Sequence, residues 1–344
     1  DLHSFPTRRS SDLMRDVDVV TGAAGFIGSH LVDALLAAGR RVVGIDNLAV
    51  GRWENIAQHQ ANPAFRFVTG DVADRALMRE TIAGAARVFH LAAMADIVPS
   101  VQNPAVYFDA NVNGCFAVAE AARLAGVERV LYAGSSSCYG IPDVYPTPET
   151  ARIDPRYPYA LTKNLGEQLL LHWAQLYGLP VVSLRMFNVY GPRARTSGSY
   201  GAVFGVFLAQ KRAGKPLTVV GDGTQTRDFT YVSAVVAAYL AAAERGRPGG
   251  IYNVGSGGTV SVNRLVELLG AEQVVHIPKR PGEPDCTFAD IAKITGELGW
   301  TPQVGIEEGV ARLLLEVDQW RDAPVWTAES IGEATKDWFR FIKT

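Results

Sequence analysis

The stretch TGAAGFIGSH, residues 21–30, decides the fold class of this chain. It follows a short apolar segment, Asp18–Thr21, that has the character of a buried strand. Its three glycines, Gly22, Gly25 and Gly28, are spaced GxxGxxG. Glycine at such positions permits a tight turn, lets the backbone approach a pyrophosphate and lets a helix pack closely on a strand. Because free N–H groups at a helix N-terminus bind phosphate, the stretch predicts a strand, a turn and a helix that together bind a dinucleotide.

Strand-like and helical segments alternate outward from this turn. The first helix is predicted at Ile27–Ala38 and ends at Gly39. The strands that follow are predicted at Arg41–Ile45, Phe65–Thr69, Arg87–Ala92, Val130–Ala133 and Val181–Arg185, with long helices at Pro104–Ala125 and Tyr159–Tyr177. Short and nearly all-apolar strands separated by helices indicate a parallel sheet covered on both faces. The predicted fold class is α/β, a Rossmann-type doubly wound parallel sheet with a smaller interleaved α/β substrate domain.

The composition changes after Gly191, where polar and turn-forming stretches become frequent. Further short strands are predicted at Leu217–Val220 and Val274–Ile277, and an amphipathic helix within Trp320–Thr344. These changes suggest a division of the chain. The dinucleotide-binding domain is predicted at 14–188 with a return segment at about 230–257. The second domain is predicted at 189–229 and 258–344. Residues 1–13, before Met14, are expected to be extraneous or disordered.

The composition excludes several classes of protein. Of the 344 residues 48% are hydrophobic and 20% are charged, which favours a sizeable core over disorder. The formal net charge of -2 gives no reason to expect a nucleic acid as partner. Cys115, Cys138 and Cys286 lie far apart and form no CxxC pair, which disfavours disulfides and a metal site and predicts free thiols in a reducing cytoplasm. No apolar run approaches the ~20 residues of a membrane span, so no membrane association is expected.

Two aspartates end predicted strands near the glycine turn. Asp46 follows the second strand, where a carboxylate accepts hydrogen bonds from ribose hydroxyls and repels a 2′-phosphate. NAD is therefore favoured over NADP as the cofactor. Asp71, with Val72 beside it, ends the third strand and can meet the adenine amino group. Each aspartate could instead be a turn or helix-cap residue. The complete predicted cofactor site is Gly22, Gly25, Phe26, Ile27, Gly28, Asp46, Asn47, Asp71, Val72, Leu91, Ala92, Ala93, Asn111, Tyr159 and Lys163.

A serine, a tyrosine and a lysine are predicted to form the catalytic site. Ser135 lies at the carboxyl end of a predicted parallel strand, where such folds place ligands. Tyr159 and Lys163 are four residues apart and share one face of a helix. A lysine ammonium and an oxidised nicotinamide both favour the phenolate and lower the pKa of tyrosine from its usual ~10. Tyr159 can then remove a proton from a substrate hydroxyl that Ser135 also contacts. The alternative is a surface pair with a core-facing tyrosine.

Eight motifs follow one another along nearly the whole chain from Met14. They are TGAAGFIGSH, HLAA at His90–Ala93, NVNG at Asn111–Gly114, SSSCYG, YALTK, RMFNVYGP at Arg185–Pro192, GDGTQTRDFTYV at Gly221–Val232 and KRPGEPDCTFAD at Lys279–Asp290. In this order they resemble the extended short-chain dehydrogenase/reductase superfamily, and within it the nucleotide-sugar 4-epimerases. A family resemblance of this kind implies a fold and a set of site residues.

The resemblance implies roles for individual residues. Ser135 matches the catalytic serine or threonine of the family. Asn188 matches an asparagine that contacts the phosphates of the nucleotide sugar. Arg227 and Arg280 match arginines that clasp the diphosphate, a use that suits a forked donor. Glu283 matches an acidic residue that holds the nucleotide ribose. For the two arginines, a structural ion pair or a solvated face is the alternative.

Departures from related patterns narrow the implied chemistry. The 4,6-dehydratases carry Asp-Glu where this chain has Ser136 and Ser137, and serine cannot supply that acid–base pair. Relatives that act on glucuronate often carry threonine in place of Asn188, which disfavours a uronate. Thr287 falls at a position that gates N-acetyl sugars, and a small residue there implies room for that group. The predicted substrate-binding residues are Ser136, Ser137, Asn188, Arg227, Arg280, Glu283 and Thr287.

The activity that the resemblance implies is 4-epimerisation of UDP-GlcNAc/UDP-GalNAc or UDP-Glc/UDP-Gal through a transient 4-keto sugar, with NAD held tightly. A nucleotide-sugar oxidoreductase, a 4,6-dehydratase and a non-catalytic NAD-binding protein are the alternatives. Members of this family pair through a four-helix bundle. The alanine- and leucine-rich faces of Pro104–Ala125 and Tyr159–Tyr177 therefore predict a homodimer, unless both faces are buried within one subunit.

Overall fold

The computed structural model describes residues 16–194 and 201–342, and a parallel sheet of seven strands forms its centre. From one edge to the other the strands are β11 Gly250–Val254, β6 Val181–Met186, β5 Arg129–Ser135, β4 Arg87–His90, β1 Val17–Thr21, β2 Arg41–Asp46 and β3 Phe65–Thr69. All six neighbouring pairs are parallel. Because the chain builds outward from β1 first to one side and then to the other, the sheet is doubly wound. The predicted fold class is confirmed.

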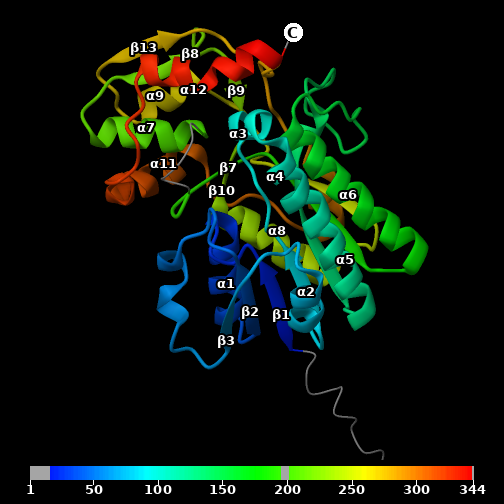
Figure 1. Cartoon of the computed structure of the whole chain (residues 1–344). Helices are drawn as coiled ribbons and strands as arrows, with labels where there is room; N and C mark the ends of the chain where they lie inside the picture. Colours follow the sequence, from blue (N-terminus) through cyan, green and yellow to red (C-terminus); the bar gives the residue numbers. More distant parts are fainter. Residues whose placement is uncertain (1–15, 195–200, 343–344) are drawn as a thin grey trace, which may run out of the picture.

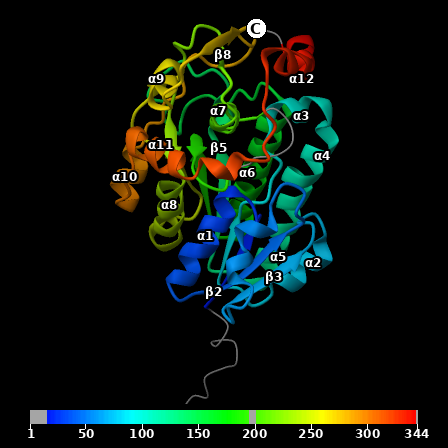
Figure 2. The same ribbon diagram turned by 90° about the vertical axis from the view of Figure 1, so that its left-hand side faces the viewer.

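Helices cover both faces of this sheet (Figures 1 and 2). One layer holds α1 Phe26–Ala37, α8 Val232–Arg245 and α10 Ala292–Leu298, and the other holds α2 Arg75–Ile82, α5 Gly114–Ala125 and α6 Pro158–Tyr177. Adjacent residues of one strand belong to different layers. Val20 of β1 lies in a core with Leu31 and Tyr239, whereas Val19 lies in a core with Val118. Burial on both faces explains why these strands are almost entirely apolar.

The segment predicted as one helix at Pro104–Ala125 has three parts. They are α4 Pro104–Phe108, a π-helical turn η4 at Asp109–Asn113 and α5, and a short helix α3 Ile97–Gln102 precedes them. Gly126, in the left-handed conformation at φ 62°, caps the end of α5. A π-turn changes the direction in which the following side chains point and is frequent at functional sites. Here it lies next to the catalytic helix α6.

A smaller part of the chain lies beyond the carboxyl ends of the sheet strands, at the top of Figure 1. It contains three strand pairs, namely β7 Asn188–Tyr190 with β10 Phe229–Tyr231, β8 Leu217–Val220 with β13 Val274–Ile277, and β9 Thr226–Arg227 with β12 Val260–Ser261. Helices α7 Val203–Arg212, α9 Val262–Leu268 and α11 Ile306–Leu315 pack with them, and the described 3-10 helices are η2 Trp53–Asn55, η3 Ala57–His59, η5 Ser136–Tyr139 and η6 Val317–Trp320. Tyr190 stacks on Phe204 at 4.4 Å between ring centroids in the core of this part.

The last helix, α12, spans Ala328–Phe341. The amphipathic helix predicted within Trp320–Thr344 therefore begins later than the start of that range, because Thr327 caps it. The Thr327 hydroxyl accepts the Ser330 N–H at 3.2 Å, and the Ser330 hydroxyl accepts the Thr327 N–H at 2.9 Å. Within 16–194 and 201–342, no helix is both long enough and apolar enough to cross a membrane. The prediction for residues 1–13 lies outside the described residues.

Candidate active site

The glycine turn leaves no room for side chains where a dinucleotide would approach. Gly22 has φ 70°, and a Cβ there would lie 2.8 Å from the backbone nitrogen of Ala92. A Cβ on Gly28 would lie 2.0 Å from the carbonyl oxygen of Gly22. Helix α1 then begins at Phe26, and its N-cap, Gly25, has no side chain with which to cap the first amides. These N–H groups are available to a phosphate, so the turn fits the pyrophosphate of NAD.

Two buried residues that the sequence did not single out hold the loop opposite this turn. The hydroxyl of Thr21 accepts the N–H groups of Leu91 and Ala92, both at 3.1 Å, and bonds Nδ1 of His90 at 2.8 Å. Burial lowers the pKa of His90 to about 3, so its ring is neutral. Both residues stand inside quoted motifs, TGAAG and HLAA. They fix the position of Leu91, Ala92 and Ala93, which are predicted to contact the cofactor.

The two aspartates make turn contacts at the ends of β2 and β3. The buried carboxylate of Asp46 accepts the N–H of Ala24 at 3.1 Å and that of Leu48 at 2.8 Å, and burial raises its pKa. Asp71 accepts the Asn47 amide at 3.0 Å. The turn role that the sequence left open is therefore present at both aspartates. The predicted contacts of Asp46 and Asp71 with the cofactor remain predictions. Both residues lie at the carboxyl ends of parallel strands, β2 and β3, where folds of this class bind ligands.

Asn111 supports the site from within the π-turn. Its amide nitrogen donates to the carbonyl of Met94 and to the hydroxyl of Thr162, each at 3.0 Å, and its oxygen accepts the Met94 N–H at 2.8 Å. The side chain is 2% exposed. Asn111 therefore ties the segment after β4 to helix α6, and its predicted contact with the cofactor stays a prediction.

Ser135 and Tyr159 lie within hydrogen-bond distance of each other. The Tyr159 hydroxyl donates to Oγ of Ser135 at 3.2 Å, and Ser135 Oγ lies 2.7 Å from Oγ of Ser137. Ser135 ends β5, Ser137 lies in η5, and Tyr159 lies in the first turn of α6. Lys163 follows Tyr159 by one helical turn, and its Nζ lies 4.5 Å from the ring centroid of Tyr132. The structure thus brings the predicted serine and tyrosine together.

The protonation of the tyrosine differs from the sequence-based prediction. Burial raises the pKa of Tyr159, although its hydrogen bonds with Ser135 and Ser137 lower it in part. Burial also lowers the pKa of Lys163, to about 8. The expected lowering of the tyrosine pKa by the lysine was therefore wrong for the protein groups alone. The physical reason is that the Lys163 ammonium faces the ring of Tyr132, while desolvation disfavours the phenolate.

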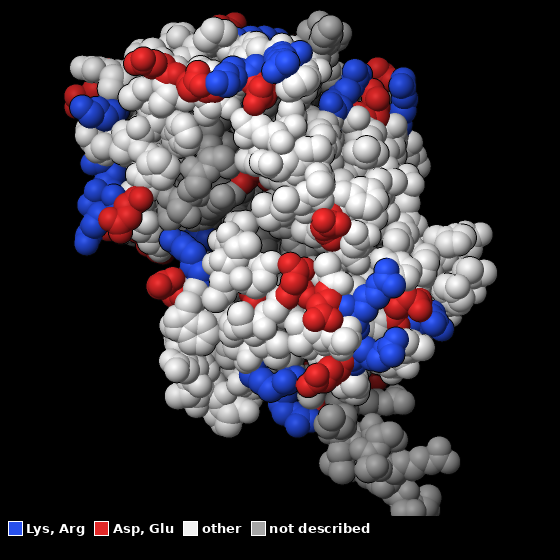
Figure 3. Space-filling view, viewed as in Figure 1, with Lys and Arg blue, Asp and Glu red and all other residues white. Residues whose placement is uncertain are grey.

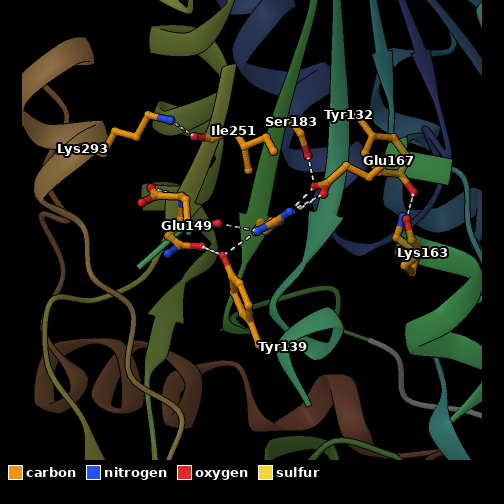
Figure 4. A network of polar contacts seen from close by, with 10 residues as sticks. Tyr132, Tyr139, Glu149, Lys163, Glu167, Ser183, Ile251 and Lys293 are labelled. Carbon is orange, nitrogen blue, oxygen red and sulfur yellow. Dashed lines mark hydrogen bonds and ion pairs between the residues drawn. The ribbon is translucent and has the colours of Figure 1, made fainter. Parts of the chain in front are cut away.

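A buried polar network holds the elements of this site together (Figure 4). Arg185 of β6 forms an ion pair with Glu167 of α6 at 2.6 Å, and Ser183 donates to the same carboxylate at 2.6 Å. Arg185 also donates to the hydroxyl of Tyr139 at 2.9 Å, and this hydroxyl donates to the side chain of Asn253 in β11 at 2.8 Å. The network connects the catalytic helix α6, the 3-10 helix η5 that follows Ser135 and the neighbouring strands β6 and β11.

Five of the seven predicted substrate residues form two clusters in the smaller part, whereas Ser136 and Ser137 lie in η5 after Ser135. Arg227 Nη2 lies 3.0 Å from Glu283, and Arg280 Nη1 lies 3.9 Å from the same carboxylate. The hydroxyl of Thr287 donates to the side-chain oxygen of Asn188 at 2.8 Å. A cavity of about 500 Å³ opens beside the first cluster. Its lining is Val220, Gly221, Asp222, Thr224, Gln225, Thr226, Arg227, Lys279, Glu283, Pro284 and Asp285.

Asp228 is a buried carboxylate that sequence reasoning missed. It accepts the N–H of Ser256 at 2.6 Å and that of Ala289 at 3.0 Å, and its own N–H donates to Thr287 at 3.1 Å. Burial raises its pKa, and the two backbone N–H bonds oppose that effect. The residue stands in the quoted motif GDGTQTRDFTYV, directly after Arg227. It fixes the loops that place Thr287 and Arg227 relative to each other.

Comparison with known proteins identifies the family. The model of the NAD dependent epimerase/dehydratase family matches residues 19–255. The chain is 41% identical over 304 residues to the UDP-glucose 4-epimerase of Mycolicibacterium smegmatis, covering 86% of this chain and 96% of that protein.

Solved structures agree with this match. The crystal structure of UDP-glucose 4-epimerase with UDP-glucose from Thermotoga maritima superposes with a TM-score of 0.82 at 35% identity, covering 88% of this chain and 98% of that one. UDP-glucuronic acid 4-epimerase from Bacillus cereus, in complex with UDP-glucuronic acid and NAD, also gives 0.82, at 32% identity and with 88% and 99% covered. With a family model that matches most of the chain and relatives aligned over nearly their whole length, the chain belongs to the NAD dependent epimerase/dehydratase family.

Proposed function

We propose that this protein is an NAD-dependent nucleotide-sugar 4-epimerase that acts on UDP-hexoses, either UDP-Glc/UDP-Gal or UDP-GlcNAc/UDP-GalNAc. The observation that carries the proposal is the hydrogen bond from Tyr159 to Ser135 at the carboxyl end of the sheet. The glycine turn lies at the same end of the sheet. The cluster of Arg227, Arg280 and Glu283 belongs to the smaller part that lies over this end, and it supplies an anchor for a diphosphate.

The protein groups have separable roles in this reaction. Tyr159 removes the proton of the sugar 4-hydroxyl, and Ser135 holds the same oxygen. NAD, held at the glycine turn of Gly22, Gly25 and Gly28, would supply reversible hydride chemistry at C4 and a positive charge that favours the phenolate. Arg227 and Arg280 hold the diphosphate, so the 4-keto sugar can turn over without leaving. Tyr159 finally returns its proton to the new 4-hydroxyl.

The residues after Ser135 favour epimerisation over loss of water. The hydroxyl of Ser137 is bonded to Ser135 at 2.7 Å, so it belongs to the hydroxyl cluster around Tyr159. Ser136 and Ser137 offer neither a carboxylic acid nor a carboxylate for elimination. A 4,6-dehydratase needs both at these positions according to the sequence resemblance. Dehydration is therefore the less favoured chemistry for this family member.

The proposal includes the division of labour between two domains. Residues 14–188 with the return segment 230–257 would bind NAD, and residues 189–229 with 258–344 would bind the nucleotide sugar. The pairing of β11 with β6 in the central sheet supports this division, because it returns the chain to the cofactor side. A cytoplasmic location, which the free thiols suggest, belongs to the same proposal.

We also propose a homodimer through α4, α5 and α6. These helices expose large apolar side chains, among them Phe108 at 44%, Leu124 at 54% and Leu176 at 60%. In the view of Figure 3, the surface over α4 and the upper part of α6 carries few charged side chains. An apolar helical face of this kind suits an isologous contact with a second copy, in which four helices would form a bundle.

The direct test is an NMR assay without added cofactor. Purified protein is incubated with UDP-Glc and separately with UDP-GlcNAc, and the anomeric H1 signals are followed. The galacto isomer should appear and reach equilibrium, because bound NAD is regenerated in each turnover. The Tyr159→Phe variant is the control and should form the isomer at least about 100-fold more slowly. If neither sugar changes even with NAD added, the assignment to UDP-hexoses is refuted.

A further inference from the structure

The C-terminal helix α12 connects two parts of the candidate site that are distant in sequence. Figures 1 and 2 both show it beside α3, the helix that follows β4. Its inward face carries Ile331, Thr335 and Trp338, which are buried, and Ile342 follows at the helix end. Trp338 and Ile342 form a small apolar core with Val98 of α3. The helix is thus attached to the segment that leaves the cofactor sheet.

The same face of α12 fixes the loop that carries Arg280 and Glu283. The indole N–H of Trp338 donates to the carbonyl of Pro281 at 2.7 Å. The guanidinium carbon of Arg280 lies 5.4 Å from the Trp338 ring centroid, a distance that allows a cation–π interaction. A Cβ on Gly282 would lie 2.7 Å from Ile342, so this loop and the helix end are in close contact. The loop therefore takes its position from α12.

Trp338 also reaches toward the catalytic tyrosine. Its ring centroid lies 6.2 Å from that of Tyr157. Tyr157 in turn lies parallel to Tyr159, with 6.3 Å between centroids and 9° between ring planes. One row of side chains therefore leads from Arg280 through Trp338 and Tyr157 to the proton-transfer site.

We propose that Trp338 is a positioning residue that sets the distance between the nucleotide anchor and the catalytic tyrosine. The inference rests on the proposed function, because it assumes that Arg280 holds the diphosphate while Tyr159 acts on the sugar. The indole fixes the guanidinium of Arg280 with its ring and the backbone of Pro281 with its N–H. Its contact with Tyr157 keeps Arg280 and Pro281 at a fixed position relative to Tyr159. No residue of α12 itself needs to touch the reacting atoms.

The test compares substitutions at two buried tryptophans in the full-length holoenzyme. Trp338→Leu removes the ring and the N–H donor, whereas Trp338→Phe keeps a ring for Arg280 and Tyr157. Trp320→Leu is the matched control, since Trp320 is 1% exposed in a different core of the same terminal region. The measurements are the Kd for UDP by calorimetry, kcat and KM for the UDP-hexose, the bound NAD content and the melting temperature.

Trp338→Leu should weaken UDP binding about tenfold, equivalent to about 1.4 kcal/mol, and raise KM while bound NAD is unchanged. It should also lower kcat, because the sugar is no longer held at a fixed distance from Tyr159. Trp338→Phe should recover most of the UDP affinity. Trp320→Leu should lower the melting temperature with little change in UDP affinity.

Two results would overturn the inference alone. One is wild-type affinity for UDP in folded Trp338→Leu, and the other is an equal loss of affinity in Trp320→Leu, which would show a general effect of destabilisation. Wild-type protein that bound UDP in a Trp338-dependent manner but epimerised no UDP-hexose would refute the proposed function and leave only the support of the nucleotide anchor by Trp338. Wild-type protein that bound no UDP would overturn both.

Discussion

Replacing Glu167 by glutamine should destabilise the protein strongly, because it leaves a buried guanidinium without its counter-charge. The side chains of Glu167 and Arg185 are only 4% and 5% exposed, and they contact each other at 2.6 Å. Breaking a buried ion pair by removing one partner costs about 3–5 kcal/mol. At about 2 °C for each kcal/mol in a chain of this size, the melting temperature should fall by roughly 6–10 °C. Because Glu167 lies on α6, the helix that carries Tyr159, this buried ion pair is also a structural support for Tyr159.

Differential scanning calorimetry of the wild type and Glu167→Gln at pH 7.5 measures this shift. Glu308→Gln is the control, because its partner Arg312 is an exposed neighbour one helical turn away. Loss of such a surface pair costs at most about 1 kcal/mol, or about 2 °C. A melting temperature of Glu167→Gln that falls no further than that of Glu308→Gln would refute the reasoning.

Four further predictions concern the cofactor, the chemistry, pH and assembly. Tyr159→Phe should lower kcat by at least about 100-fold while bound NAD, measured by absorbance after denaturation, stays at the wild-type level; an active variant would exclude this tyrosine as the base. Asp46→Asn should tighten binding of NADP, measured by calorimetry, because a carboxylate no longer faces the 2′-phosphate; unchanged NADP affinity would place Asp46 outside the ribose site. The pKa of His90 is lowered from 6.5 to about 3, so the unfolded state binds an extra proton between these values and stability falls as the pH falls through this window. Between pH 7.5 and pH 5 the wild type should therefore lose up to about 2 kcal/mol more unfolding free energy than His90→Gln, and equal losses would contradict a neutral His90. Phe108→Glu should convert the dimer to monomers in sedimentation experiments, and a wild type that is already monomeric would refute the proposed bundle.

Six of the seven strands of the central sheet could be predicted closely, because they are short apolar runs between turn formers, whereas β11 was not predicted. The predicted strand Phe65–Thr69 coincides with β3, and the predicted strand Val181–Arg185 is one residue shorter than β6. The strand predicted to run to Ala92 ends at His90 instead. The reason is that the N–H of Ala92 bonds the hydroxyl of Thr21 instead of continuing the ladder. Such an exchange depends on a side chain about 70 residues away and leaves no local pattern.

Features decided by tertiary contacts could not be predicted. The π-turn in the helix predicted at Pro104–Ala125 places Asn111 between Met94 and Thr162, and nothing in the local periodicity indicates it. The two-residue strands β9 and β12 are too short for any alternation to appear.

In the candidate site, too, some features could be predicted from the sequence and others depend on tertiary contacts. The order of Ser135 and Tyr159 at a strand end and a helix start was enough to expect their contact. The direction in which the pKa of Tyr159 is shifted could not be predicted. It depends on where the Lys163 ammonium points and on how deeply the phenol is buried. The role of the C-terminal segment was also out of reach, since the contact of Trp338 with Pro281 joins residues 57 positions apart.

The most direct test of 4-epimerisation uses a UDP-hexose that carries deuterium at C4 of the sugar. The enzyme is incubated with this substrate in ordinary water and without added cofactor, and the product is analysed by NMR and mass spectrometry. If the hydrogen at C4 is removed and returned within one active site, the epimer should keep its deuterium at C4. No net reduced cofactor should be present at equilibrium. Loss of the deuterium to solvent, or reduced cofactor formed in proportion to substrate consumed, would contradict the account.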